Sequence, residues 1–228
     1  MTLSARQQLI LFIILAFVVD YLPFVNLPFM WSETFFHEIS HGLAAIFTGG
    51  EILNITLNFD GSGHCTTLGG TNFIITFAGY LGSALWGLLI YSLASSLSQS
   101  SAKIMTGIML AMLATTLLLW ARDSSTIIIL AILLLMYTLP LIKVLWFSVK
   151  FFIQLVGIFV LLDSIRSPLY LLDGRDLGDG ASLAELSWLP ELFWIASWIM
   201  IATACLYLLW LNSAKKQNPD QLKPEAVA

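Results

Sequence analysis

The chain has 228 residues, of which 58% are hydrophobic and 11% are charged, and its formal net charge is −4. Soluble globular domains carry about a quarter charged residues, so this composition excludes an ordinary soluble protein and predicts a multi-pass integral protein of the lipid bilayer. No basic stretch is long enough to follow a phosphate backbone, which argues against nucleic acid as a partner.

The first hydrophobic segment, at roughly 8–28, follows a single basic residue, Arg6. A signal peptide begins in the same way, but no small-x-small cleavage site follows, so we expect an uncleaved membrane helix. Hydropathy predicts further membrane helices at roughly 72–95, 103–120, 125–142, 144–163 and 189–211. We expect one polytopic membrane domain over about 1–211 and a short solvated tail over about 212–228.

A shorter helix is predicted between the first two of these segments. Ser32 suits its N-cap and Gly49-Gly50 is a strong stop signal, so it would have about 16 residues and a length of roughly 24 Å. This length is short for a full crossing of about 30 Å of hydrocarbon. The sequence therefore predicts about six to seven membrane helices.

A β-hairpin is predicted directly after this helix. Residues 51–59 alternate between polar and apolar, Asp60-Gly61-Ser62-Gly63 suits a turn, and residues 64–68 can return as a second strand. Backbone of this kind at membrane depth must lie against protein or water, so we expect the hairpin to pack on the preceding helix. Its open edge could receive an extended peptide as an added strand. The predicted fold class is thus membrane all-α, a polytopic helical bundle with a small membrane-associated β-hairpin.

Small residues recur every four positions in the segment that follows the hairpin, at Gly79, Ser83 and Gly87. Such a stripe lets two membrane helices approach closely. Gly42 and Ala45 offer a matching face on the short helix. We expect these two helices to pack together.

The short helix contains the sequence His37-Glu38-Ile39-Ser40-His41, which fits the H-E-x-x-H pattern. Residues i and i+4 share one face of a helix, so both imidazoles can bind one zinc ion, and Glu38 can act as the general base for a zinc-bound water. The simpler alternative is a pair of interfacial histidines beside a snorkelling glutamate. A catalytic zinc needs a third protein ligand, which the motif does not supply.

The sequence around this motif resembles a known family. The stretch Phe36-His-Glu-Ile-Ser-His-Gly-Leu-Ala-Ala-Ile-Phe-Thr-Gly-Gly-Glu51, followed by the hairpin and Ala78-Gly-Tyr-Leu-Gly-Ser83, is similar to the site-2-protease-like zinc metalloproteases, in their small, presumed-peptidase branch. The resemblance implies an intramembrane zinc metalloprotease that hydrolyses peptide bonds of membrane-associated protein substrates. It also implies a bacterial inner membrane as the location and a metal-site core over about 30–95 and 155–195.

The resemblance implies an aspartate as the third zinc ligand, from the acidic region that follows the helix near 144–163. Asp179 is the first candidate and Asp163 is the second. As alternatives, Asp179 could cap a helix and Asp163 could be a hydrogen-bonded interfacial group. Asp173 and His64 are weaker candidates for the ligand.

Cys65 and Cys205 lie far apart in dissimilar segments, so we expect free thiols rather than a disulfide.

The alternative function is a catalytically inactive metal-binding or regulatory membrane protein of the same fold. A transporter is not supported, because the sequence shows neither an inverted repeat nor a pair of broken helices.

Overall fold

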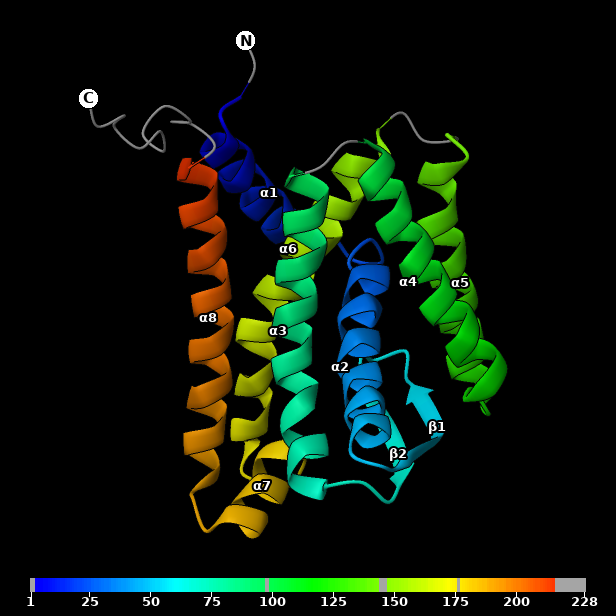
Figure 1. Ribbon diagram of the computed structural model, residues 1–228, viewed down its shortest axis with the longest axis vertical. Helices are drawn as coiled ribbons and strands as arrows, with labels where there is room; N and C mark the ends of the chain where they lie inside the picture. Colours follow the sequence, from blue (N-terminus) through cyan, green and yellow to red (C-terminus); the bar gives the residue numbers. More distant parts are fainter. Residues whose placement is uncertain (1–2, 97–98, 144–146, 176, 216–228) are drawn as a thin grey trace, which may run out of the picture.

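The computed structural model describes residues 3–96, 99–143, 147–175 and 177–215. Its helices are α1 (Ala5–Asp20), α2 (Leu27–Phe47), α3 (Asn72–Ser96), α4 (Gln99–Leu119), α5 (Ser124–Leu141), α6 (Val149–Arg166), α7 (Asp179–Ser187) and α8 (Glu191–Lys215), with a 3₁₀ helix η1 (Ser167–Asp173) before α7. Strands β1 (Glu51–Leu57) and β2 (Gly63–Leu68) form a two-stranded antiparallel sheet between α2 and α3. Figure 1 shows α2 between α3 and the α4–α5 pair, with the hairpin at its C-terminal end.

Five helices in the described part of the chain are long and apolar enough to cross a membrane. They are Asn72–Ser95, Gln99–Leu119, Ser124–Leu141, Val149–Leu172 and Glu191–Ala214. The protein is therefore an integral membrane protein, mostly helical as predicted. Neither α1 nor α2 belongs to these five, so the predicted six to seven membrane helices exceed the number of candidate spans.

The first helix is shorter than predicted. It ends at Asp20 and has 16 residues, whereas hydropathy alone extended it to about residue 28. Pro23 disfavours helical backbone at the residue before it, and Phe24 has a positive φ of 65°. These two residues turn the chain, and the apolar residues after them begin α2 instead.

The helix with the H-E-x-x-H sequence begins earlier than predicted, so the expected N-cap at Ser32 is wrong. It begins at Leu27, with Pro28 in its first turn, where a missing N–H costs nothing. Ser32 lies inside the helix, where its hydroxyl donates to the Pro28 carbonyl at 2.7 Å and accepts from Tyr137. The predicted end is confirmed, because α2 stops at Phe47 and Gly49 has a φ of 86°.

The small-residue stripe on α3 serves two different neighbours. A Cβ on Gly87 would lie 2.7 Å from the backbone nitrogen of Leu161, so this glycine lets α3 approach α6. Gly157 of α6 likewise allows this approach, because a Cβ there would lie 2.6 Å from the backbone nitrogen of Tyr91 in α3. Gly79 faces α2, and so does the neighbouring Gly82, where an added Cβ would overlap the side chain of Ser40. The predicted partner Gly42 faces the hairpin, where an added Cβ would meet the side chain of Ile52.

The predicted hairpin is confirmed, and its two edges differ. The strands pair from Glu51 opposite Leu68 to Leu57 opposite Gly63. The outer edge of β1 is occupied, because its Ile55 N–H donates to the Trp120 carbonyl at 3.1 Å and its Leu57 N–H donates to the Thr126 hydroxyl at 2.7 Å. The outer edge of β2 is therefore the one on which a further strand could pair.

The end of the last helix differs slightly from the prediction, whereas the cysteines agree with it. Helix α8 continues to Lys215, a few residues into the expected tail, and residues 216–228 lie outside the described residues. Cys65 and Cys205 are both free thiols, as predicted.

Candidate metal centre

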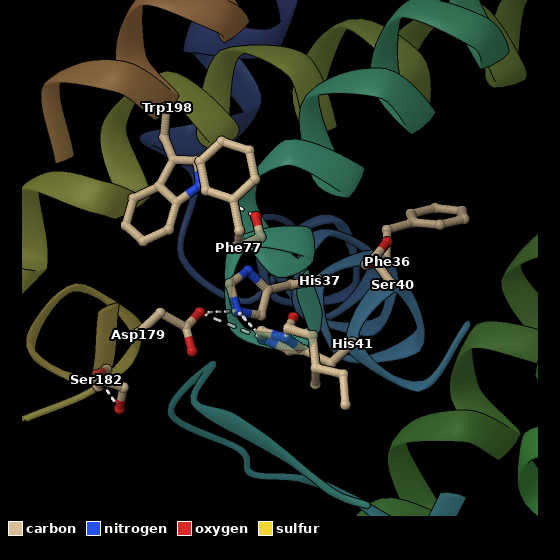
Figure 2. A network of polar contacts seen from close by, with 10 residues as sticks. Phe36, His37, Ser40, His41, Phe77, Asp179, Ser182 and Trp198 are labelled. Carbon is tan, nitrogen blue, oxygen red and sulfur yellow. Dashed lines mark hydrogen bonds and ion pairs between the residues drawn. The ribbon is translucent and has the colours of Figure 1, made fainter. Parts of the chain in front are cut away.

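Three side chains from two distant parts of the sequence meet at one point. The Nε2 atoms of His37 and His41 lie 3.0 Å apart. The Oδ2 atom of Asp179 lies 3.1 Å from the first and 3.3 Å from the second. Figure 2 shows both imidazoles and the carboxylate turned toward this common point. Within the described residues, these three form the group of histidine, cysteine and acidic side chains that could hold a metal ion.

The size of this triangle suits zinc. Zinc bonds to histidine nitrogen and carboxylate oxygen are about 2.0–2.2 Å long, and a tetrahedron with such bonds has edges of about 3.3–3.6 Å. The three measured separations are 3.0, 3.1 and 3.3 Å, close to these edges. The ligand atoms would have to move apart only slightly to reach these edges, and three protein ligands would leave a fourth position open, as catalytic zinc sites require.

The tautomer of His41 is fixed by the backbone of α3. Its Nδ1 lies 2.6 Å from the carbonyl oxygen of Ile75, which can only accept a hydrogen bond. Nδ1 therefore carries the proton, and the lone pair of Nε2 is directed to the metal site. A histidine ligand is usually oriented by such a bond from its other nitrogen.

His37 is oriented by packing. The edge of its ring meets Tyr80 of α3 at a centroid distance of 4.4 Å, and Tyr80 in turn packs on Trp198 of α8. Gly79 makes this close approach of α3 possible, because a Cβ there would lie 2.6 Å from the His37 Nε2 and closer still to His41. Both imidazoles are thus held between α2 and α3.

Asp179 is the first residue of α7, and two glycines bring it to the site. Gly178 has a φ of 96°, which favours glycine, and a Cβ on Gly180 would lie 2.6 Å from the Glu191 carboxylate. Leu183 anchors the same short helix in a cluster with Trp194 and Trp198. These contacts explain how a residue so far along the chain reaches α2.

Electrostatics agree with a ligand role for Asp179. Burial raises the pKa of its carboxyl, but the adjacent His41 and His37 imidazoles outweigh burial and hold that pKa well below its usual range. The carboxyl is therefore ionised at neutral pH. An anionic oxygen beside two imidazole nitrogens is the donor set that zinc prefers over magnesium or calcium.

The other predicted ligand candidates lie elsewhere. Asp163, at the end of α6, pairs with Arg166 at 2.9 Å, and Arg166 also pairs with Asp20 of α1. His64 is an exposed residue of β2. Asp173 ends η1, and its side chain lies outside the described part of the structure. Among the candidates whose side chains the structure describes, Asp179 is the one that lies against both imidazoles.

Glu38 lies between the imidazoles and the hairpin. Its side chain is 4% exposed, and a Cβ on Gly63 would lie 2.6 Å from its Oε1. Gly63 thus lets β2 begin directly over the carboxylate. The Glu38 carboxylate thus follows the metal-ligand candidate His37 directly in the sequence and lies beside the start of β2.

These groups line one large cavity of about 980 Å³, between α1, α2, α3, α6, η1, α7 and β2. It includes all five residues of the predicted site, which are His37, Glu38, His41, Asp179 and Asp163, and also the weaker candidate His64. The volume is ample for several residues of an extended peptide.

Two cavity residues were missed by the reading of the sequence. Glu33 stands one helical turn before His37, so the series 33, 37, 41 lies on one face of α2. Tyr80 lies inside the motif that carried the family resemblance. The spacing of Glu33 was the signal that could have revealed it.

Replacing Gly79 by alanine should weaken zinc binding at least about tenfold, because the new methyl group overlaps both imidazoles and must push α3 away from α2. Zinc content after dialysis against a competing chelator measures the effect. Gly107→Ala in α4 is the matched control, since nothing lies within 4 Å of its added Cβ. Equal zinc retention in both variants would contradict this account of the packing.

Comparison with known proteins agrees with this geometry. The family model described as Peptidase M50B-like matches residues 10–209, which is most of the chain. No curated protein and no solved structure matches the chain significantly. The match confirms the resemblance read from the H-E-x-x-H region and extends it over the acidic region that carries Asp179. The chain therefore belongs to the Peptidase M50B-like family of membrane metalloprotease-like proteins.

Proposed function

We propose that this protein is an intramembrane zinc metalloprotease that hydrolyses peptide bonds of membrane-associated protein substrates. The observation that carries the proposal is the meeting of His37, His41 and Asp179 at zinc-compatible distances, with Glu38 beside them in one cavity. The family and the five candidate spans support a protease in a membrane. We propose the bacterial inner membrane as its location, as the resemblance to the small, presumed-peptidase branch implies.

The residues divide the chemistry between them. His37, His41 and Asp179 would hold the zinc, which when bound lowers the pKa of water and polarises a carbonyl. Glu38 takes the proton from the attacking water and passes it to the amine that leaves when the peptide bond breaks. Its side chain is buried, and Gly63 lets the start of β2 lie directly against it.

The hairpin supports a way to hold the substrate. A peptide that pairs with the outer edge of β2 would satisfy the backbone groups of that strand and lie extended along the cavity. Gly63 and His64 at the start of β2 line the cavity together with Glu38. Extended pairing here would therefore bring a peptide bond over the catalytic residues.

Metal removal tests the proposed function. The protein purified in detergent should contain about one zinc per chain and cleave some members of a library of membrane-anchored peptides. Treatment with 1,10-phenanthroline should abolish cleavage, and added zinc should restore it. Cleavage sites are read by mass spectrometry.

Two outcomes would count against the proposal. A folded protein that binds no zinc after metal-replete preparation would not be a zinc enzyme. A protein that holds zinc but cleaves no member of the library would fit the inactive metal-binding alternative instead.

A further inference from the structure

The cavity contains a carboxylate that the proposed chemistry does not use. Glu33 is 6% exposed, and its Oε1 has no hydrogen-bond partner among the residues that the structure describes. The same side chain lines the cavity that holds the metal site. A carboxyl group so deeply buried is costly to ionise unless a cation or a hydrogen-bond donor satisfies its charge, and it otherwise stays protonated.

Glu33 lies about one helical turn from the metal site, where the reacting peptide bond would be held. It precedes His37 by one turn on α2, a rise of about 6 Å, and its side chain points to the same face of the helix. A peptide residue whose carbonyl lies at the metal site would therefore have Glu33 one helical turn away. Only a long side chain covers that separation, and lysine and arginine have such side chains.

The ion pairs that the structure describes in this cavity involve carboxylates other than Glu33. Arg166 is shared between Asp20 and Asp163. Asp179 faces the two imidazoles. Among the described residues that line the cavity, acidic side chains outnumber arginines. The acidic residues are Asp20, Glu33, Glu38, Asp60, Asp163 and Asp179, and the arginines are Arg166 and Arg175. Two charges on a zinc ion would offset only part of this negative excess.

We propose that Glu33 is a specificity-determining residue that binds the basic side chain of a substrate residue next to the scissile bond. This inference rests on the proposed protease function and names a feature of its substrates. An ammonium or guanidinium group would form a charge-assisted hydrogen bond with the buried carboxylate, stronger than a bond between neutral groups. Neutral side chains of similar length would leave the carboxylate unpaired.

Zinc-binding probes test the inference without requiring turnover. Short peptidyl hydroxamates anchor on zinc and place one side chain beside it. We would compare an arginine hydroxamate with its citrulline counterpart, which has nearly the same shape without the charge. Two series place this residue on the amino or the carboxyl side of the hydroxamate. Affinities are measured by calorimetry on the zinc-loaded, full-length protein in detergent.

In wild type, the arginine probe should bind at least about tenfold more tightly than the citrulline probe in one of the two series. In Glu33→Gln this preference should fall to about twofold or less, while zinc content and affinity for the citrulline probe stay unchanged. Asp60→Asn is the matched control. It removes one negative charge from the cavity lining, but from an exposed turn where Asp60 bonds to Ser62, so the preference should persist.

The failures are distinguishable. Equal binding of both probes in both series, with zinc present, overturns the role of Glu33 and leaves the metalloprotease proposal intact. Loss of affinity for both probes in Glu33→Gln would show a structural role and also overturns the inference. If wild type holds no zinc and binds no probe, the proposed function itself fails and the inference fails with it.

Discussion

Replacing Glu38 by glutamine should abolish peptide hydrolysis while about one zinc per chain remains bound. Glutamine has nearly the same shape as glutamate but cannot accept the proton of the attacking water. Loss of a general base lowers the rate by roughly 10²–10⁴-fold. The metal should stay, because the three converging ligand atoms belong to His37, His41 and Asp179. Cleavage rate and zinc content, measured on the same preparation, check the prediction.

A control separates this effect from a general loss of negative charge. Glu51→Gln makes the same chemical change at an exposed residue of β1, outside the cavity, and should keep both activity and zinc. Undiminished activity in Glu38→Gln would exclude Glu38 as the base. Loss of zinc together with activity would instead show that Glu38 supports the metal site.

The local part of this site could be predicted from the sequence because its chemistry is local. His37, Glu38 and His41 lie within five residues, and the helical period alone places both imidazoles on one face. The hairpin was equally predictable, since the alternation over residues 51–59 and the Asp-Gly turn are short-range signals. The register was not predicted, because it shifts between Ile52 and Asn54, which these signals do not indicate.

Helix boundaries were less predictable, because apolar residues continue through the turn between α1 and α2. Hydropathy assigns residues 21–28 to the first span, whereas Pro23 and the left-handed Phe24 end it early. Ser32 looked like an N-cap because serine prefers that position. In the structure Pro28 starts the helix, and Ser32 bonds back to the Pro28 carbonyl instead.

Long-range relations were the hardest to predict. His37 and Asp179 are 142 residues apart, and no local pattern brings them together. The contact depends on the tryptophans of α8, which anchor α7, and on Gly178, whose φ of 96° directs the chain toward the site. The environment of Glu33 depends on the same packing, because only the folded cavity shows that its Oε1 is buried without a hydrogen-bond partner among the described residues.

Replacing Asp179 by asparagine should lower zinc affinity by more than about 100-fold, whereas Asp163→Asn should leave it nearly unchanged. Asparagine keeps the size of the side chain but removes the negative charge that partly neutralises the metal. Even groups that only support a ligand contribute about 10–100-fold to metal affinity, so loss of a ligand charge should cost more. Asp163 instead faces Arg166, which would keep its contact with Asp20.

The measurement is zinc occupancy across a series of chelator-buffered zinc concentrations, with wild type and both variants in the same detergent. The two variants lose the same charge from the same cavity, so a difference between them reports contact with the metal and not the electrostatics of the cavity as a whole. If Asp163→Asn released zinc and Asp179→Asn retained it, α7 would not carry the third ligand. The pairing of Asp163 with Arg166 would then have to open when zinc binds, because Asp163 would have to leave Arg166 to reach the imidazoles. With the side chains placed as they are, Asp179 needs no such rearrangement, since its Oδ2 already lies 3.1 and 3.3 Å from the two nitrogen atoms.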